Sequence, residues 1–254
     1  AEASDEIGQS FGWVERIRSA LANEEFELFA QPIIDFEGRE RPMYEVFLRM
    51  RASDGSLIAP GAFLPVAERH DLIQSIDAWV FSEAITMLAE RGGPDAEFGV
   101  CVNLSGRSVG DPRLVDLISS RLRETGVDPS RLVFEVTELE SSVEFRDVSR
   151  IITLLREVGC SCAIDDFGAG YGGFDHLKDM AFDIIKVDGR FIEGLAHSPV
   201  DRAITSGIVA AAKAAGRTVV AEFVTDKETL DILAGIEVDC VQGQLIGMPA
   251  PVVA

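Results

Sequence analysis

The stretch "YEVFLRM", residues 44–50, sets the first question, because it combines the composition of a β-strand with an acidic residue. Its aromatic, β-branched and long apolar residues suit a pleated, half-buried surface. Glu45 lies near the start of this run, and a carboxylate is costly to bury unless a cation meets it. The question is therefore which cation meets Glu45.

Strand-like and helical patterns alternate along the chain around this stretch. The strand-like runs cover residues 26–33, 44–50, 100–105, 132–138, 161–167, 183–188, 218–224 and 240–246, and helical patterns cover 13–23, 73–90, 113–124, 145–158, 201–215 and 226–234. Strands that alternate with helices of this length predict βαβ units and a parallel sheet. Eight strands without a linker-like break favour an α/β fold, a modified (β/α)8 TIM-type barrel.

The join between the first two strands is an exception to this alternation. Only "IDFEGRERPM", residues 34–43, separates them, which is too short for a crossover helix and suits a hairpin. One of the two strands must therefore be antiparallel to the rest of the barrel. Because Glu45 comes early in its strand, we expect that strand to be the reversed one, so that Glu45 reaches the mouth of the barrel.

Composition limits the classes of function. The formal net charge of −20 disfavours general binding of DNA or RNA, whose phosphates such a surface repels. The 47% hydrophobic content supplies a sizeable core, and no apolar run approaches the length of a membrane span. Four cysteines without a CxxC pair indicate buried, reduced thiols.

These features, with the lack of a signal-peptide pattern, predict a cytoplasmic protein. We expect residues 1–12 to be a linker stub and residues 13–254 to form one barrel domain.

Polar residues collect where the later strands end, which is where parallel barrels place their chemistry. They are Asn103, Glu135, Glu138, Asp165, Asp166, Lys186, Glu222 and Gln242. Each alone has an ordinary explanation, such as a solvent-facing glutamate, a snorkelling lysine or a turn aspartate. Their common phase on six consecutive strands favours one shared site.

Carboxylates and an amide without nearby histidine or cysteine select a hard divalent cation, Mg²⁺ or Mn²⁺. The adjacent carboxylates of Asp165 and Asp166 suit a pair of ions that share one ligand, as in phosphoryl hydrolysis. Such ions would also allow an acidic protein to bind a phosphorylated substrate.

The motifs "QPI", "YEVFLRMR", "VNLSGRS", "FEVTE", "AIDDFGAGYGGF", "DIIKVDG", "AEFV" and "QG" resemble, in order and spacing, those of bacterial EAL domains. The resemblance covers the chain from about Phe26 to Pro251. It implies a modified (β/α)8 barrel that hydrolyses cyclic di-GMP to linear pGpG with Mg²⁺ or Mn²⁺. It also implies a homodimer and upstream sensor or diguanylate-cyclase-like domains, through which the full-length protein is sometimes membrane-anchored.

The resemblance also implies a role for each site residue. The implied metal ligands are Glu45, Asn103, Glu135, Asp165 and Asp166, with Glu222 as general base or further ligand. Lys186 would position the attacking water, and Glu138 would anchor the loop that follows Asp165 and Asp166. The implied substrate contacts are Gln31, Pro32, Arg49 and Gln242. Calcium is expected to bind and inhibit, because its larger coordination shell suits the two-ion geometry poorly.

Several positions depart from the family pattern. The signature reads Glu-Val-Phe at residues 45–47, and the bulk of Val46 and Phe47 raises the question whether Glu45 reaches an ion. Glycines 172 and 173, Thr225 and Met248 replace hydroxyl, acidic and arginine residues common in the family. A catalytically silent receptor for cyclic di-GMP is therefore the alternative to an active phosphodiesterase, and an unrelated metal-dependent barrel enzyme is the third possibility.

Overall fold

The computed structural model describes residues 2–36, 38, 42–91, 98–137, 145–170 and 177–252, with backbone alone at 2–11, 112 and 145. The strands are β1 (Phe26–Asp35), β2 (Met43–Arg51), β3 (Leu57–Ile58), β4 (Gly99–Asn103), β5 (Leu132–Thr137), β6 (Ser161–Phe167), β7 (Ile184–Val187), β8 (Thr218–Ala221), β9 (Cys240–Gln242) and β10 (Ala250–Pro251). The helices are α1 (Glu2–Ala22), α2 (Leu64–Arg69), α3 (Ile73–Glu90), α4 (Gly106–Val109), α5 (Pro112–Thr125), α6 (Phe145–Val158), α8 (Gly189–Ile192), α9 (Pro199–Ala214) and α10 (Lys227–Gly235). Short 3-10 turns, η1 (Pro60–Ala62) and η3 (Pro129–Arg131), precede α2 and β5.

Eight of these strands close into a barrel. Their order is β1-β9-β8-β7-β6-β5-β4-β2, and β1 pairs with β2 to close the ring. The ring confirms the barrel predicted from the alternation, and each predicted strand corresponds to one barrel strand. The small strands β3 and β10 extend the sheet from β2 and β1 outside the ring.

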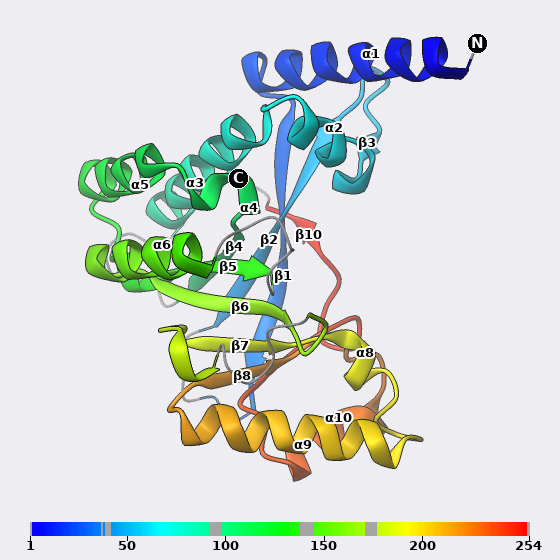
Figure 1. Ribbon diagram of the computed structural model, residues 1–254, viewed down its shortest axis with the longest axis vertical. Helices are drawn as coiled ribbons and strands as arrows, with labels where there is room; N and C mark the ends of the chain where they lie inside the picture. Colours follow the sequence, from blue (N-terminus) through cyan, green and yellow to red (C-terminus); the bar gives the residue numbers. More distant parts are fainter. Residues whose placement is uncertain are drawn as a thin grey trace.

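The reversed strand is β1, and the expectation that the strand of Glu45 is reversed was wrong. β1 is antiparallel to both of its barrel neighbours, whereas β2 is parallel to β4. Only Met43–Glu45 pair with β4, and the rest of β2 continues beyond the barrel beside β1 toward α1 (Figure 1). Glu45 therefore lies early in a long strand and yet at the C-terminal end of its barrel segment.

Helices cover the outside of the barrel, as in Figure 1, where α3, α5 and α6 lie on one side and α9 and α10 on the other. The five longer helices predicted between residues 73 and 234 are all present, within two residues of the predicted ends. Residues 2–12 differ from expectation, because they belong to the helical backbone of α1. No proline interrupts this segment, and Glu2, Ala3 and Glu6 favour helix. Among the described residues, no helix combines the length and hydropathy needed to cross a bilayer.

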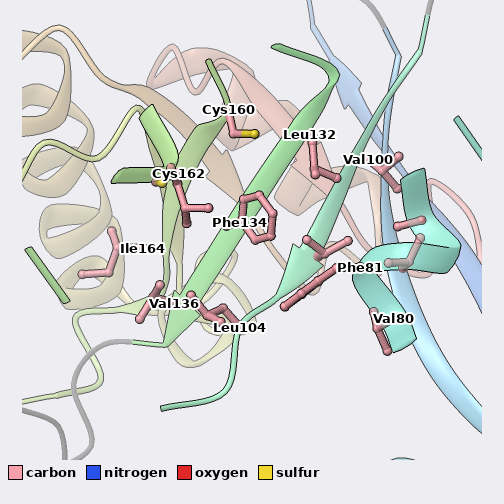
Figure 2. Packing of buried hydrophobic residues seen from close by; sticks show 14 of the residues in the cluster. Val80, Phe81, Val100, Leu104, Leu132, Phe134, Val136, Cys160, Cys162 and Ile164 are labelled. Atoms are coloured by element: carbon pink, nitrogen blue, oxygen red, sulfur yellow. The ribbon is translucent and has the colours of Figure 1, made fainter. Parts of the chain in front are cut away.

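The outward faces of the strands pack against these helices. Figure 2 shows Val100, Phe134 and Cys162 of three neighbouring strands in contact with the layer that includes Phe81 of α3. The rings of Phe81 and Phe134 meet edge to face at 5.2 Å. All four cysteines are buried thiols outside any disulfide, as predicted.

The inward faces form two layers. The apolar layer contains Ile33, Met43, Cys101, Val133, Ala163, Ile184, Val220 and Cys240, one from each barrel strand. Because strand side chains alternate with a period of two, the next inward residue lies two positions away. These residues are Gln31, Glu45, Asn103, Glu135, Asp165, Lys186, Glu222 and Gln242. The step is −2 on the reversed β1 and +2 on every other strand, which places all eight polar side chains at one end of the barrel.

Candidate active site

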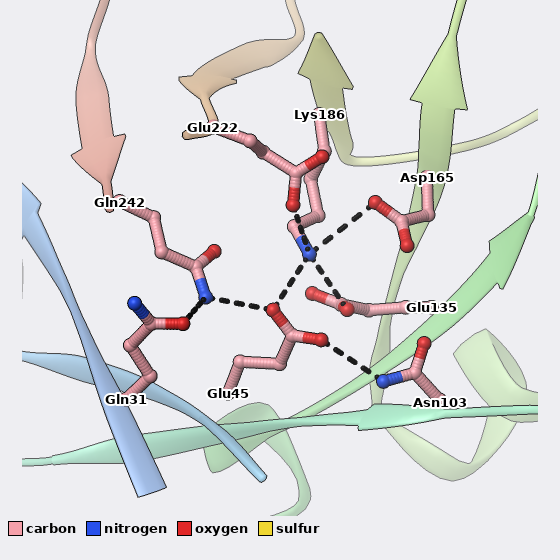
Figure 3. A network of polar contacts seen from close by, with 8 residues as sticks. All are labelled: Gln31, Glu45, Asn103, Glu135, Asp165, Lys186, Glu222 and Gln242. Carbon is pink, nitrogen blue, oxygen red and sulfur yellow. Dashed lines mark hydrogen bonds and ion pairs between the residues drawn. The ribbon is translucent and has the colours of Figure 1, made fainter. Parts of the chain in front are cut away.

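Lys186 lies at the centre of the polar layer and meets the carboxylates of four strands (Figure 3). Its Nζ is 3.0 Å from Glu45, 2.9 Å from Glu135 and 2.9 Å from Glu222. The Oδ1 of Asp165 is 3.3 Å away and is an ion-pair partner rather than an aligned hydrogen-bond acceptor. The ammonium group is fully buried, so it is the cation that the sequence around Glu45 requires.

Amide side chains hold the carboxylate of Glu45 from two sides. Asn103 Nδ2 donates to Glu45 Oε1 at 3.0 Å, and Gln242 Nε2 donates to Glu45 Oε2 at 2.8 Å. Gln242 also donates to Gln31 Oε1 at 3.2 Å, and Gln31 donates to the Gly247 carbonyl oxygen at 2.8 Å. Both oxygens of Glu45 are thus aimed into the barrel mouth despite the bulk of the next two residues.

The buried carboxylates differ in their affinity for protons. Burial opposes the charge of Glu45, but Lys186 and the two amides outweigh it and lower the pKa. Burial and the charge of Glu45 raise the pKa of Glu135 well above its usual range. Burial, opposed by Lys186, raises the pKa of Glu222 to about 8. One ammonium is insufficient to neutralise this cluster, which therefore retains protons or requires further positive charge.

The backbone is distorted next to two of these carboxylates. Asp166 and Phe223, which follow Asp165 and Glu222, have φ angles of 52° and 54°. Left-handed φ values are rare for residues other than glycine and collect at functional sites. At Asp166 the distortion coincides with a register shift between β6 and β7, and both aspartates can then face the mouth. Burial and the neighbouring Asp165 raise the pKa of Asp166 to about 6.

The mouth of the barrel fits a divalent metal on three observations. Asp165, Asp166 and Glu222 each offer an oxygen, and these atoms lie within 4.8 Å of one another. Within the part of the chain that the structure describes, Glu135 Oε1 is buried without a hydrogen-bond partner. All of these candidate ligand atoms are carboxylate oxygens, which suit Mg²⁺ or Mn²⁺ better than zinc.

A cavity of about 490 Å³ opens above this cluster. Its floor includes Glu45, Asn103, Asp165 and Gln242, and its walls include Phe47, Asp166, Glu193, Glu222, Phe223, Thr225, Gly243, Gln244, Met248 and Pro249, with Gln31 beside the floor. A space of this size, lined by apolar side chains such as Phe47, Phe223 and Met248 together with convergent polar groups, is typical of a small-ligand site.

Phe223 forms an aromatic wall of the cavity and is 56% exposed. Its ring lies against Gly189, where an added Cβ would come within 2.4 Å of the ring. The glycine therefore lets the Phe223 side chain pack closely against the start of α8. Phe223 is not among the site residues predicted from the sequence, although an aromatic residue directly after a site glutamate indicates a wall of the same site.

A profile of the EAL domain matches residues 14–249. The chain belongs to the EAL domain family. It is 34% identical over 248 residues to the cyclic di-GMP phosphodiesterase PdeF of Escherichia coli K12. This alignment covers 98% of the chain and 33% of PdeF. It is 32% identical over 240 residues to the cyclic di-GMP phosphodiesterase PdeB of Shewanella oneidensis, covering 94% of this chain and 28% of PdeB. The chain thus spans about a third of the length of these curated relatives.

Solved EAL domains share the fold. The MucR phosphodiesterase in complex with c-di-GMP matches with a TM-score of 0.86 and 32% identity over 95% of this chain and 98% of that one. The EAL domain of FimX from Xanthomonas citri, also in complex with c-di-GMP, matches with a TM-score of 0.91 and 28% identity over 99% of this chain and 98% of that one.

The EAL domain brings together most of the residues singled out from its sequence, but not all. Arg49 and Pro32 do not line the cavity; the Arg49 guanidinium lies 5.3 Å from the Phe29 ring centroid and donates to the Leu48 carbonyl oxygen at 2.8 Å. Glu138 and the two glycines at 172 and 173 lie outside the described residues. The roles predicted for Arg49, Pro32 and Glu138 stay predictions.

Another buried carboxylate, that of Asp77, stabilises the turn next to the EAL site. Asp77 of α3 accepts hydrogen bonds from the Oγ and the backbone N–H of Ser105, two residues after Asn103. Burial raises the pKa of Asp77 to about 6, against the effect of these hydrogen bonds. Asp77 therefore ties α3 to the turn that presents Asn103.

This raised pKa predicts a pH-dependent effect of Asp77→Asn. In the folded protein the Asp77 pKa is about 6, above the usual 3.8, so the wild type loses stability as the pH rises through this window. Between pH 4 and pH 7.5 the unfolding free energy of the wild type should fall by about 2 kcal/mol relative to that of the variant. Urea unfolding at both pH values measures it.

The matched control is Asp71→Asn, whose carboxylate is exposed and pairs with Arg107. Its stability difference should be nearly independent of pH over the same range. An Asp77→Asn difference that is equally flat would contradict the buried, raised-pKa state of Asp77.

Proposed function

We propose that this EAL domain hydrolyses cyclic di-GMP to linear pGpG, with Mg²⁺ or Mn²⁺ bound at the carboxylate cluster. The observation that carries the proposal is the complete polar layer, in which Glu45, Glu135, Asp165 and Glu222 surround Lys186 at the base of the cavity. The phosphodiesterases PdeF and PdeB, and the c-di-GMP complex of MucR, support the choice of substrate.

The residues that would hold the ions are Glu45, Asn103, Glu135, Asp165, Asp166 and Glu222. Bound there, divalent ions supply a water of lowered pKa and neutralise the charge of the substrate phosphate. Asn103 and Gln242 fix the orientation of Glu45, and Lys186 keeps the buried carboxylates in place. Glu222, whose carboxylate lies 2.9 Å from Lys186 Nζ beside this cluster, would take up the water proton as general base or act as a further ligand.

The bond changes follow from the product. The oxygen of one water forms a bond to one phosphorus, the bond from that phosphorus to the 3′ oxygen breaks, and the 3′ oxygen takes up a proton. The second phosphodiester stays intact, so the product is a linear dinucleotide with a 5′ phosphate.

A cyclic di-GMP receptor without turnover is the second candidate, and the departures from the family pattern at Thr225 and Met248 are the observations that bear on it. Both line the cavity at positions where the family often carries charged residues, and Met248 is 62% exposed there. Neither contributes to the carboxylate cluster, and we therefore propose that they affect substrate affinity rather than the reaction.

Purified protein with cyclic di-GMP separates the two candidates. We expect pGpG to form in Mg²⁺ or Mn²⁺ and to be suppressed in Ca²⁺, which binds oxygen ligands with a larger, irregular shell. Chromatography of the nucleotides measures product, and calorimetry in Ca²⁺ measures binding. Binding without turnover in Mg²⁺ or Mn²⁺ would establish the receptor instead.

Phe223→Ala should weaken binding of cyclic di-GMP by about tenfold to a hundredfold, because stacking of a base on an aromatic ring contributes about 1–3 kcal/mol. Titration in Ca²⁺ measures the dissociation constant. Phe223→Trp should retain most of the affinity, and Leu245→Ala, an exposed apolar residue that does not line the cavity, is the control. Unchanged affinity in Phe223→Ala would exclude a stacked base at this wall.

A further inference from the structure

Glu193 differs from the other carboxylates of the cavity. Those of Glu45, Asp165, Asp166 and Glu222 belong to the metal-binding cluster or to Lys186. Glu193 is exposed at the end of α8 and lines the same cavity, and its carboxylate makes no hydrogen bond or ion pair with the part of the chain that the structure describes. It is therefore an acceptor available to a ligand.

The backbone that carries Glu193 is well fixed. Its N–H donates to the Gly189 carbonyl oxygen at 2.8 Å, and the nearby side chains of Ile192 and Leu195 are fully buried. The ring of Phe223 packs against Gly189, the first residue of the same helix. The free carboxylate and the exposed aromatic face thus rest on the same short helix at one wall of the cavity.

An aromatic face and a carboxylate recognise different properties of a nucleobase. Stacking on Phe223 accepts any base, because every base has a π-face. The Watson–Crick edge of guanine carries two neighbouring donors, its ring N–H and its amino group, and an ionised carboxylate has two acceptor oxygens for them. Adenine presents an acceptor at the ring position, which a carboxylate repels.

We propose that Glu193 is the specificity-determining residue that selects guanine at the Phe223 wall, by accepting hydrogen bonds from the edge of the stacked base. The inference rests on the proposed function and assigns to one of the two bases a recognition residue outside the metal cluster. The neutral side chains Thr225 and Gln244 line the cavity without offering a paired anionic acceptor.

A position of Glu193 next to a phosphate of the ligand would have the opposite effect on affinity. If Glu193 faced a phosphate of the ligand, its charge would weaken binding, and Glu193→Gln would bind cyclic di-GMP more tightly. The direction of the change in affinity therefore separates edge recognition from proximity to phosphate.

The test compares cyclic di-GMP with cyclic di-IMP, which lacks the amino groups, and with cyclic di-AMP. Dissociation constants are measured in Ca²⁺, and KM and kcat in Mg²⁺, for the wild type, Glu193→Gln and the control Glu228→Gln. Glu228 is an exposed carboxylate on α10 that does not line the cavity.

We expect Glu193→Gln to bind cyclic di-GMP about tenfold or more weakly, as befits loss of a charge-assisted hydrogen bond. The preference of the wild type for cyclic di-GMP over cyclic di-IMP should shrink in the variant by a similar factor. KM should rise while kcat changes by less than about twofold, because the contact lies outside the reacting atoms. Glu228→Gln should match the wild type in every measurement.

Two results overturn the proposal while leaving the proposed function intact: Glu193→Gln binds cyclic di-GMP as tightly as the wild type or more tightly, or the wild type does not distinguish cyclic di-IMP from cyclic di-GMP. If the wild type neither binds nor hydrolyses cyclic di-GMP, the proposed function and this inference fall together.

Discussion

Glu45→Gln should reduce kcat/KM for cyclic di-GMP by about a thousandfold or more, because a lost metal ligand removes several kcal/mol of transition-state stabilisation. The amide keeps the size of the side chain and can still accept the hydrogen bond from Asn103. The loss should therefore appear in turnover and in Mn²⁺ affinity while the fold is retained. Initial rates across Mn²⁺ concentrations, with calorimetry of Mn²⁺ binding, measure both.

Glu27→Gln is the matched control for this variant. Glu27 lies in β1, in the same antiparallel pair, and its carboxylate pairs with Arg51 outside the cavity. Its turnover should stay close to that of the wild type. A Glu45→Gln protein that turns over at the wild-type rate would remove Glu45 from the catalytic site.

Lys186→Met should abolish turnover and also destabilise the metal-free protein. The variant leaves the carboxylates of Glu45, Glu135, Asp165 and Glu222 without their buried cation. Removing one partner of a buried ion pair costs about 3–5 kcal/mol. Mn²⁺ should restore part of this stability, because a ligand that binds only the folded state stabilises it by mass action. Thermal unfolding in EDTA and in Mn²⁺ measures both effects.

Lys213→Met is the comparison, because Lys213 is 37% exposed and meets Glu237 and Asp239 only at 3.7 and 3.8 Å. Its stability should change by about 0.5 kcal/mol or less. A Lys186→Met protein as stable in EDTA as the wild type would contradict the buried ion-pair network, and full activity would exclude a catalytic role for the lysine.

The fold was predictable because its determinants are local. Alternation of strand and helix patterns predicted the barrel, and the period of two along each strand placed the polar residues on one face. Asn103, Glu135, Asp165, Lys186, Glu222 and Gln242 follow their apolar neighbours by two positions on parallel strands, so a shared site could be inferred without contacts.

The direction of the first two strands could not be predicted, because a hairpin fixes their relation to each other and not to the remaining strands. The structure settles it through pairing: Glu45 pairs with Cys101 in parallel register, and Ile33 pairs with Gln242 in antiparallel register. The C-terminal end of β8 was also misjudged, because the strand ends at Ala221 rather than at residue 224. Phe223 at a φ of 54° ends the extended backbone before Val224, whose N–H donates to the Gln242 carbonyl oxygen.

The walls of the site depend on distant contacts and carry weaker sequence signals. Phe223 packs closely against Gly189 because this residue lacks a Cβ, and that contact joins segments more than thirty residues apart. Asp77 supports Ser105 across 28 residues. Glu193 has no periodicity or motif to identify it, and only the closed barrel shows that it lines the cavity.

Hydrolysis of cyclic di-GMP in ¹⁸O-labelled water, with Mg²⁺ and analysis of the nucleotides by mass spectrometry, tests the central claim most directly. We predict linear pGpG that carries one ¹⁸O atom on its 5′ phosphate, because one water oxygen joins one phosphorus as the bond to the 3′ oxygen breaks. The pGpG should be absent in Glu45→Gln and present in Glu27→Gln. Unchanged cyclic di-GMP with the wild-type protein, or pGpG without the label, would contradict hydrolysis by water at this site.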